Sequence, residues 1–172
     1  MTPEKLVTTY LEMTTPAAFR PNYAQQGDDV SIVKMEKPDV DFYRFLYREV
    51  GERWRWRDRL TLSDEELYSI LSSPNTHVFV MYVNGVPAGY IELARKGQTT
   101  EIAYFGLREE FFGRGLGKHL LSYGIEQAWN MGTRRVWLHT CNLDGPHALN
   151  NYLKRGFSVC DVQEEPMPET YQ

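Results

Sequence analysis

The stretch Glu101–Lys118, EIAYFGLREEFFGRGLGK, decides the fold of this chain. Its first seven residues include Ile, Tyr and Phe, which are typical of a strand. Glycines at alternate positions follow, Gly113, Gly115 and Gly117, and an apolar helical pattern begins there. A strand, a glycine turn and a helix in this order bring unpaired backbone N–H groups and the positive end of a helix dipole to one point. The stretch therefore predicts a site for a phosphate.

Two common phosphate-binding patterns do not fit this turn. A Walker-type loop needs Gly where Phe112 stands and Ser or Thr where His119 stands. A dinucleotide-binding fingerprint needs Gly-x-Gly-x-x-Gly, whereas the chain has Gly-x-Gly-x-Gly. It also needs an acidic residue after the next strand, where Thr140, Cys141 and Asn142 stand. The turn therefore belongs to neither class.

Upstream of this stretch, the sequence predicts four strands and two helices. They are a strand Leu6–Met13, a loop marked by Pro16, Pro21 and Gly27, a strand Val30–Met35, a helix with apolar positions from Phe42 to Val50, a helix from Ser63 to Leu71, and the strands His77–Val83 and Val86–Ala94. Asp39 or Asp41 can cap the first helix, and Ser63 with Glu66 forms a capping box at the second. Asn84-Gly85 predicts a tight hairpin turn between the last two strands.

Downstream, the pattern predicts a long helix and a second group of elements. The long helix carries an apolar face from Leu116 to Ala128 and ends at Gly132. After it we expect a strand Arg135–Thr140, a turn Asp144-Gly145-Pro146, a helix His147–Arg155 closed by Gly156, a strand Phe157–Val162 and a poorly ordered acidic tail Glu164–Gln172. Residues 1–172 are predicted to form a single domain, with residues 1–29 as an added N-terminal strand and loop.

The glycine turn resembles the coenzyme A loop of the GNAT superfamily of N-acetyltransferases. The pattern of that family is Arg or Gln, two residues, Gly, one residue, then Gly or Ala. Gly115 and Gly117 match it, whereas Phe112 stands at the Arg/Gln position. The resemblance implies that backbone amides of this turn hold a pyrophosphate, and that Arg114 and Lys118 supply the charge that Phe112 lacks.

Two further stretches carry the resemblance, which covers about residues 30–162. Glu101–Leu107 is similar to the fourth strand of the family, and Ala148-x-x-x-Tyr152 through Gly156-Phe157 is similar to its later signature. The implied fold is α/β (mixed α+β), with a central, mostly antiparallel twisted sheet of about seven strands flanked by helices. The fourth and fifth family strands are expected to splay, so that the fourth pairs with the pantetheine arm.

The resemblance implies an acetyl-CoA-dependent N-acetyltransferase that acts on an amine of a small molecule or protein. Acetyl-CoA is the implied co-substrate, and no metal is expected. The implied cofactor-binding residues are Phe105, Gly106, Leu107, Phe112, Gly113, Arg114, Gly115, Leu116, Gly117, Lys118, Asn142 and Tyr152. A non-catalytic acyl-CoA-binding sensor or interaction module is the alternative function.

Acetylation of an amine needs a base, because an aliphatic amine with a pKa near about 10 is protonated at neutral pH. Glu101 stands where some family members carry a catalytic Glu and is the predicted base, with Glu92 as the reserve candidate. Tyr152 matches the general-acid Tyr of the family. Backbone N–H groups from Phe105 to Leu107, where Gly106 permits a bulge, are the expected oxyanion donors. A solvated strand-end charge for Glu101 and a core position for Tyr152 are the alternatives.

The acceptor is expected between the first two helices, where the family has its acceptor site. Trp54 and Trp56 are predicted to line it together with Glu92, while Arg53, Arg55 or Arg57 meets a carboxylate. An exposed arginine-rich turn anchored by one tryptophan is the alternative. The net charge of −4 argues against a nucleic-acid partner.

Composition sets the remaining expectations. The chain is 42% hydrophobic and 24% charged, as soluble globular proteins are. Without a leader pattern or about 18 consecutive apolar residues, we expect a cytoplasmic protein with no membrane partner. His139, Cys141 and His147 lack a metal-ligand spacing, so no metal site is predicted. The sequence is compatible with a homodimer but does not fix the oligomeric state.

Overall fold

The structure, a computed structural model, describes residues 1–24 and 29–172, so the predicted loop residue Gly27 lies outside the described part. The strands are β1 (Lys5–Met13), β2 (Val30–Lys34), β3 (Thr76–Val83), β4 (Val86–Lys96), β5 (Thr99–Leu107), β6 (Arg135–Cys141) and β7 (Ser158–Pro166). The helices are α1 (Val40–Gly51), α2 (Asp64–Ser72), α3 (Leu116–Asn130) and α4 (Ala148–Lys154). Short 3-10 turns cover Pro16–Ala18, Glu52–Trp54, Glu109–Phe111 and Glu169–Tyr171.

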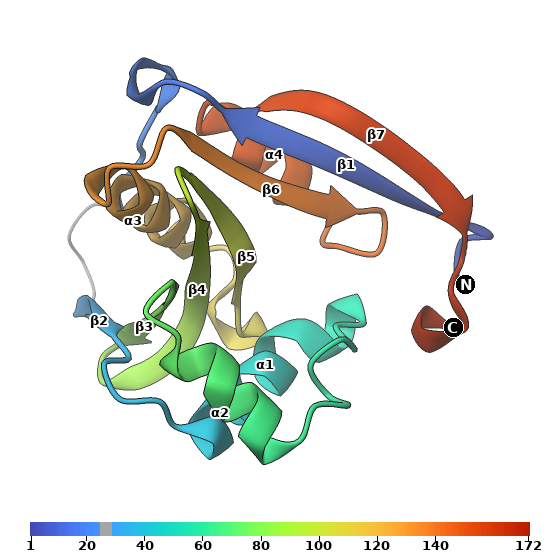
Figure 1. The fold of residues 1–172 in the computed structure, drawn as a ribbon, viewed down its shortest axis with the longest axis horizontal. Helices are drawn as coiled ribbons and strands as arrows, with labels where there is room; N and C mark the ends of the chain where they lie inside the picture. The colour runs from blue at the N-terminus through green and yellow to red at the C-terminus, as the bar shows by residue number, and fades with distance from the viewer. Residues whose placement is uncertain (25–28) are drawn as a thin grey trace.

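The strands form one seven-stranded sheet in the order β2-β3-β4-β5-β6-β1-β7. Every neighbouring pair is antiparallel except β5 and β6, which run parallel. This confirms the α/β fold with a mostly antiparallel sheet flanked by helices. The N-terminal strand β1 lies between β6 and β7 (Figure 1), so the strand predicted as an addition is an internal part of the sheet.

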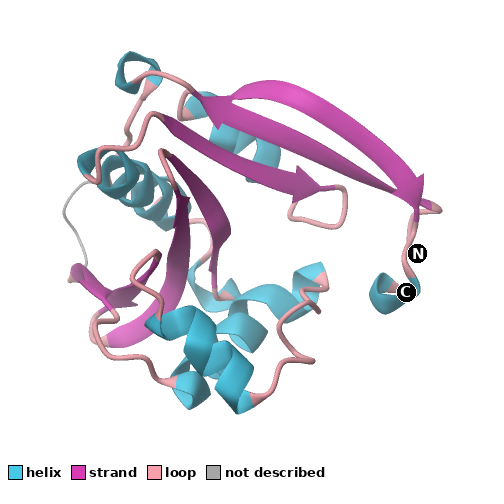
Figure 2. Cartoon of the chain, in the orientation of Figure 1, coloured by secondary structure: helices cyan, strands magenta, loops and turns pink. Residues whose placement is uncertain are grey.

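The sheet splays between β5 and β6, as the resemblance implied. The two strands pair at three positions, and the last pair joins Glu101 to Trp137. Beyond that point they diverge (Figure 2), while β5 remains paired with β4 as far as Leu107. The edge of β5 that faces β6 therefore has no strand partner from Ile102 onward among the described residues.

A bulge in β5 lies close to the point of divergence. Leu93 pairs with Ile102 and Glu92 pairs with Tyr104, so Ala103 is an extra residue on β5. A bulge adds twist and turns a strand away from its neighbour. The bulge expected at Gly106 is therefore wrong in position, because Gly106 keeps its regular pairing with Tyr90.

The two faces of the sheet carry separate apolar cores. Helix α3 covers one face, where Leu120, Leu121 and Ile125 are fully buried with residues of β3, β4 and β6. Helices α1 and α2 cover the other face of β3, β4 and β5, where Leu46 and Leu67 pack into the second cluster (Figure 1). Burying a large aliphatic side chain contributes about 1.5–3 kcal/mol, so the two cores hold both helical layers against the sheet.

The predicted helix and hairpin signals are confirmed. The Asp39 side chain accepts a hydrogen bond from Phe42 N–H at 2.9 Å and caps α1. Ser63 and Glu66 make both hydrogen bonds of a capping box at α2. Asn84 and Gly85 have φ angles of 51° and 79° in the turn between β3 and β4. These local interactions set where the elements around the cleft begin and end.

The C-terminal segment is ordered, so the expectation of a poorly ordered acidic tail from Glu164 is wrong. Strand β7 extends to Pro166, Glu164 and Glu165 pair with β1, and Met167 is buried. Every residue of β7 is exposed because the strand forms an edge of the sheet. An edge strand accepts charged side chains, and their polarity hid the strand from pattern analysis.

Candidate active site

The divergence of β5 and β6 opens into a cleft with a volume of about 1040 Å³. Its walls come from β5, β6, the turn before α3, helix α4, the segment between α1 and α2, and the C-terminal 3-10 turn. Two ends can be distinguished by these walls. The cofactor end is defined here by the α3 N-terminus, the end of β5 and α4, and the acceptor end by residues 53–59 with Tyr171.

The glycine turn leaves the first amides of α3 open to the cleft. Gly113 and Gly115 have φ angles of 77° and 74°, a left-handed conformation that favours glycine. Gly115 is the N-cap and makes no side-chain capping hydrogen bond. Leu116, Gly117 and Lys118 follow and line the cleft. The 15-residue helix therefore presents uncapped N–H groups and its positive dipole end to the cavity, which fits an anion.

Two cations lie at the same end. The Lys118 side chain folds back over the turn, with Cε 3.2 Å from the position a Gly115 Cβ would take. Arg155, which follows α4, lines the cleft although it is 6% exposed. Its Nε and Nη1 atoms are buried and have no hydrogen-bond partner among the described residues. Burial lowers the pKa of this guanidinium. An unpartnered buried guanidinium is costly, so an anion in the cleft fits here.

Of three predicted cofactor-binding residues, Phe112 lines the cleft, whereas Arg114 and Asn142 do not. Arg114 is exposed, stacks over the Phe111 ring and is not among the cleft residues. Asn142 also lies outside the cleft, because its side chain accepts from Val7 N–H at 3.0 Å and donates to Lys5 O at 2.9 Å. The Asn142 amide is therefore used to tie β1 to the end of β6, which leaves the predicted cofactor role without support.

The predicted base Glu101 lies in the cleft at the last paired position of β5. Its side chain is 25% exposed, and one carboxylate oxygen lies 3.9 Å from Nε2 of His139 on β6. Burial raises the pKa of this carboxyl group, whereas the charge of His139 lowers it. A carboxylate with a raised pKa that is open to the cavity is suited to accept a proton.

The predicted acid Tyr152 lines the same cleft from α4. Its ring packs against Phe105 of β5 at 6.2 Å and Phe157 at 6.3 Å between centroids. Burial raises the pKa of the phenol, so the group keeps its proton at neutral pH. No residue in the described part of the chain forms a hydrogen bond with its hydroxyl group. The fold thus brings Glu101 and Tyr152 to one cavity from strands and helices about 50 residues apart in the sequence.

The reserve candidate Glu92 lies behind the acceptor wall. The residue is 0% exposed and is not among the cleft residues. Its Oε1 accepts hydrogen bonds from Arg59 Nη1 and Tyr43 O–H, each at 2.6 Å, and Arg59 Nη1 also donates to Tyr43 Oη at 2.5 Å. Burial opposes the charged form of Arg59, but Glu92 raises the pKa of the guanidinium overall. Glu92 therefore positions Arg59, and of the two candidate carboxylates it is Glu101 that lines the cleft.

Both predicted tryptophans line the acceptor end. Trp56 packs against Tyr47 and Tyr104, with centroid distances of 5.5 Å and 5.1 Å. Trp54 reaches across to the loop after β6, where its ring would lie 3.2 Å from a Cβ at Gly145. Trp56 therefore anchors the segment to the core, while Trp54 spans the cleft.

The C-terminal turn forms a part of the acceptor end that the sequence did not indicate. Arg55 Nη1 donates to Tyr171 O and to Thr2 Oγ1, both at 2.7 Å. Tyr171 O–H donates to Asp58 Oδ1 at 3.0 Å. Arg59, Tyr104, His139 and Arg155 are other cleft residues that sequence analysis missed. Their roles depend on partners distant in sequence, and only the arginine-rich character of residues 53–59 was a visible signal.

The described residues offer neither a metal site nor a membrane-spanning helix. Within residues 1–24 and 29–172 no group of three or more His, Cys, Asp and Glu side chains is arranged to hold a metal ion. Nor does that part of the chain contain a helix with the length and apolar character needed to cross a membrane.

Comparison with known proteins points to one family. The profile of the acetyltransferase (GNAT) family matches residues 41–157, which is more than half of the chain. A GCN5-related N-acetyltransferase from Sphaerobacter thermophilus superposes with a TM-score of 0.68 at 16% identity, over 95% of this chain and 52% of that one. A Bacillus subtilis acetyltransferase in complex with CoA gives a TM-score of 0.60 at 22% identity, over 77% and 79% of the two chains.

A further similar fold is an aminoglycoside acetyltransferase from an uncultured soil metagenomic sample, in complex with trehalose. It gives a TM-score of 0.63 at 18% identity and covers 73% of this chain and 86% of that one. The chain spans 52–60% of the length of three of the solved structures it matches. At these identities the likeness establishes the fold.

Proposed function

The chain belongs to the acetyltransferase (GNAT) family, and from that membership we propose that it transfers the acetyl group of acetyl-CoA directly to an amine of a small molecule or protein. The observation that carries the proposal is the cleft itself. Uncapped amides of α3, the unpaired edge of β5, Glu101 and Tyr152 all open into one cavity. A nucleotide carrier with an extended thioester arm has the shape and charge that these groups accommodate.

The residues of the cofactor end fit coenzyme A. Backbone N–H groups from Leu116 to Lys118, with the Lys118 ammonium, would hold the pyrophosphate. The buried guanidinium of Arg155 offers donors to a further phosphate oxygen. The free edge of β5 beyond Ile102 would pair with the amides of the pantetheine arm as an added strand does.

Glu101 and Tyr152 carry the proton transfers in this proposal. Bound acetyl-CoA supplies an acyl group activated as a thioester. Glu101 accepts a proton from the acceptor ammonium, directly or through one water, and so frees the nitrogen lone pair to form the new N–C bond. Tyr152 donates its phenolic hydrogen toward the sulfur as the C–S bond breaks, and the second proton leaves the acetylated nitrogen and returns to the Tyr152 oxygen, directly or through water. Direct transfer needs no covalent intermediate with the protein.

The proposal is tested by two measurements on the same preparation. Calorimetric titration measures affinity for acetyl-CoA, and release of free thiol with a panel of primary amines measures transfer. We expect binding together with amine-dependent thiol release that Glu101→Gln lowers by about 10²- to 10⁴-fold. Binding with no release for any amine would identify the non-catalytic sensor instead. An absence of binding would refute both functions.

A further inference from the structure

We propose that the acceptor amine also carries an anionic group, of which a carboxylate is the simplest, and that Arg57 binds it. The inference rests on the proposed function and specifies the acceptor class of the same site. The basis is that some arginine side chains near the cleft have an ion-pair or hydrogen-bond partner among the described residues and Arg57 has none.

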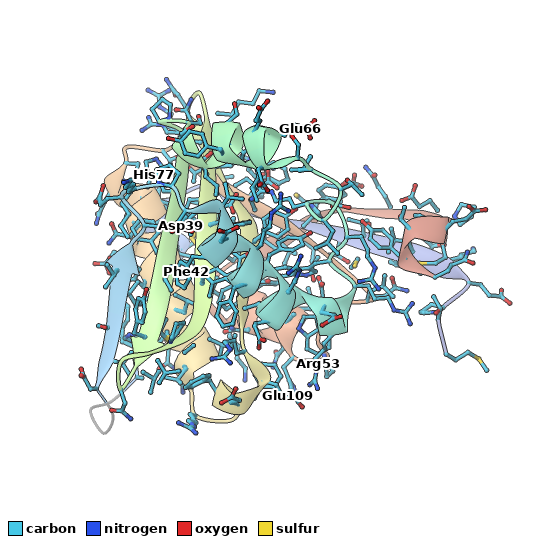
Figure 3. The ribbon with its side chains drawn as sticks, turned by 90° about the horizontal axis from the view of Figure 1, so that it is seen from below. Asp39, Phe42, Arg53, Glu66, His77 and Glu109 are labelled. Atoms are coloured by element: carbon cyan, nitrogen blue, oxygen red, sulfur yellow. The ribbon has the colours of Figure 1, made fainter. Side chains whose placement is uncertain are left out.

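Six arginines lie between residues 44 and 59, and four have a clear partner. Arg44 pairs with Asp64 at 2.9 Å, Arg53 with Glu109 at 2.6 Å, Arg55 with Tyr171 O at 2.7 Å, and Arg59 with Glu92 at 2.6 Å. Figure 3 shows Arg53 and Glu109 at the same edge of the molecule. These four guanidiniums therefore serve the fold and position the acceptor wall.

Arg48 and Arg57 have no ion-pair or side-chain hydrogen-bond partner among the described residues. Arg48 is exposed on α1 and lies outside the cleft, so water solvates it. Arg57 is partly buried and lines the cleft. A guanidinium held in a cavity wall with free donors is preorganised for a planar anion, because its fork of N–H groups matches a carboxylate.

The charges around Arg57 favour an anion over a further cation. Glu101 lines the cleft but is assigned to the base, and the Asp58 carboxylate accepts the Tyr171 hydroxyl. The third cleft carboxylate, Asp144, accepts hydrogen bonds from Thr140 Oγ1 and Cys141 N–H. Arg53 and Arg59 are already paired with carboxylates, so Arg57 keeps a guanidinium charge that no described carboxylate partners. An amine with one carboxylate can place its ammonium toward Glu101 and its anion toward Arg57.

The occupant also has an apolar body in this proposal. Trp54, Trp56 and Tyr104 line the acceptor end beside Arg57. Aromatic walls bind apolar or aromatic side chains by burial and stacking. The acceptor class that fits is therefore an amino acid with an apolar or aromatic side chain, acetylated on its α-amine.

The test measures binding by calorimetry on the full chain in the presence of CoA. The probes are phenylalanine, leucine and methionine, each compared with its own carboxamide, which lacks the anion. In the unmodified protein the acid should bind about 10- to 100-fold more tightly than the amide, the range for hydrogen bonds to a charged group. In Arg57→Gln this ratio should fall to about one, and Arg57→Lys should restore part of it. Comparing ratios between proteins cancels the difference in amine basicity between acid and amide.

The control is Arg48→Gln, which removes the same charge from an exposed position on α1 outside the cleft and should leave the ratio unchanged. An acid-to-amide ratio near one in the unmodified protein overturns the proposal. So does a ratio that Arg57→Gln leaves intact, or an absence of binding of all three acids at about 10 mM. Thiol release is measured separately, so acid-selective binding without release would refute the acetyltransferase function while leaving the anion site in place.

Discussion

The two ends of the cleft are built from different parts of the chain. At the cofactor end, the groups left open to the cleft belong to the main chain: uncapped amides of α3 and the free edge of β5. At the acceptor end, side chains hold one another in place, as in the buried contacts among Arg59, Glu92 and Tyr43. The geometry of the cofactor end therefore depends on backbone conformation. The geometry of the acceptor end depends on each side chain keeping its hydrogen-bond or ion-pair partner.

This difference explains which substitutions each end accepts. Phe112 stands where the family has Arg or Gln, yet the turn keeps the positive φ angles at Gly113 and Gly115. Arg114 stacks over the Phe111 ring and is not among the cleft residues, while the α3 N-terminus stays uncapped. A buried ion pair has no such freedom, because removing one partner leaves the other charge without compensation. The acceptor end should therefore be the less tolerant of side-chain replacement.

The largest expected effect is at Tyr152, on the α4 wall of the cofactor end. Tyr152→Phe should lower kcat by about 10²- to 10⁴-fold, the usual contribution of a general acid, and leave the affinity for acetyl-CoA unchanged. The ring would keep its packing against Phe105 and Phe157. Steady-state kinetics and calorimetry measure the two quantities separately.

The matched control is Tyr123→Phe on α3, whose ring meets Phe79 edge to face at 5.5 Å outside the cleft. It should retain full kcat. If Tyr152→Phe is as active as this control, Tyr152 is not the acid, and the thiolate leaves without help from α4.

The next largest effect is a loss of stability when the buried ion pair between Glu92 and Arg59 is broken at the acceptor end. Glu92→Leu should lower the free energy of unfolding by about 3–5 kcal/mol, because it leaves Arg59 buried without its carboxylate. The double variant Glu92→Leu with Arg59→Met should recover most of that loss. Urea unfolding measures both. In the folded fraction, the affinity for acetyl-CoA should be nearly unchanged.

Glu12→Leu serves as the control, since Glu12 pairs with Arg135 at 2.5 Å while both side chains remain about one third exposed. Its loss should be about 1 kcal/mol or less. Equal losses for Glu92→Leu and Glu12→Leu would mean that burial of the Arg59 pair does not distinguish the acceptor end.

A smaller effect is expected when the backbone of the cofactor end is disturbed. Gly115→Val places a β-branched residue at a φ of 74° and brings its Cβ to 3.2 Å from Lys118 Cε. The strain costs about 1–2 kcal/mol and is relieved by moving the α3 amides, so acetyl-CoA affinity should fall by about 5- to 30-fold. Gly97→Val carries a similar strain at a φ of 61° in the β4–β5 turn. It should lose stability but keep its affinity; equal affinity in both variants would contradict the backbone site.

Sequence patterns indicated the secondary-structure elements of the cofactor end because their signals are local. The glycine spacing, the strand Glu101–Leu107 and the position of Tyr152 each lie within a few residues of the element they specify. The capping residues Asp39 and Ser63 were predicted for the same reason. Local propensity and short motifs determine backbone geometry, and backbone geometry makes this half of the site.

The acceptor end was not predictable in the same way, because its residues act through distant partners. Arg55 Nη1 donates to a carbonyl 116 residues away, and Tyr171 O–H donates to Asp58 at a separation of 113 residues. Whether Arg53, Arg55 or Arg57 was free to meet a substrate therefore depended on contacts that no local pattern encodes. Glu92 and Glu101 are both glutamates on neighbouring strands, and the sequence alone does not distinguish them. Their exposure does, because Glu92 is 0% exposed and the Glu101 side chain is 25% exposed.

The smallest effect is a displacement of the pH profile at Glu101. Burial raises the pKa of this carboxyl group and the charge of His139 lowers it. A base works when deprotonated, so kcat/KM should fall as the pH drops through the Glu101 pKa. His139→Asn removes the lowering charge, which raises the Glu101 pKa further and moves the acidic limb to higher pH. Kinetics between pH 5 and 9 measure the limb. A limb that stays in place or moves to lower pH in His139→Asn, or one that persists unchanged in Glu101→Gln, would show that another group titrates.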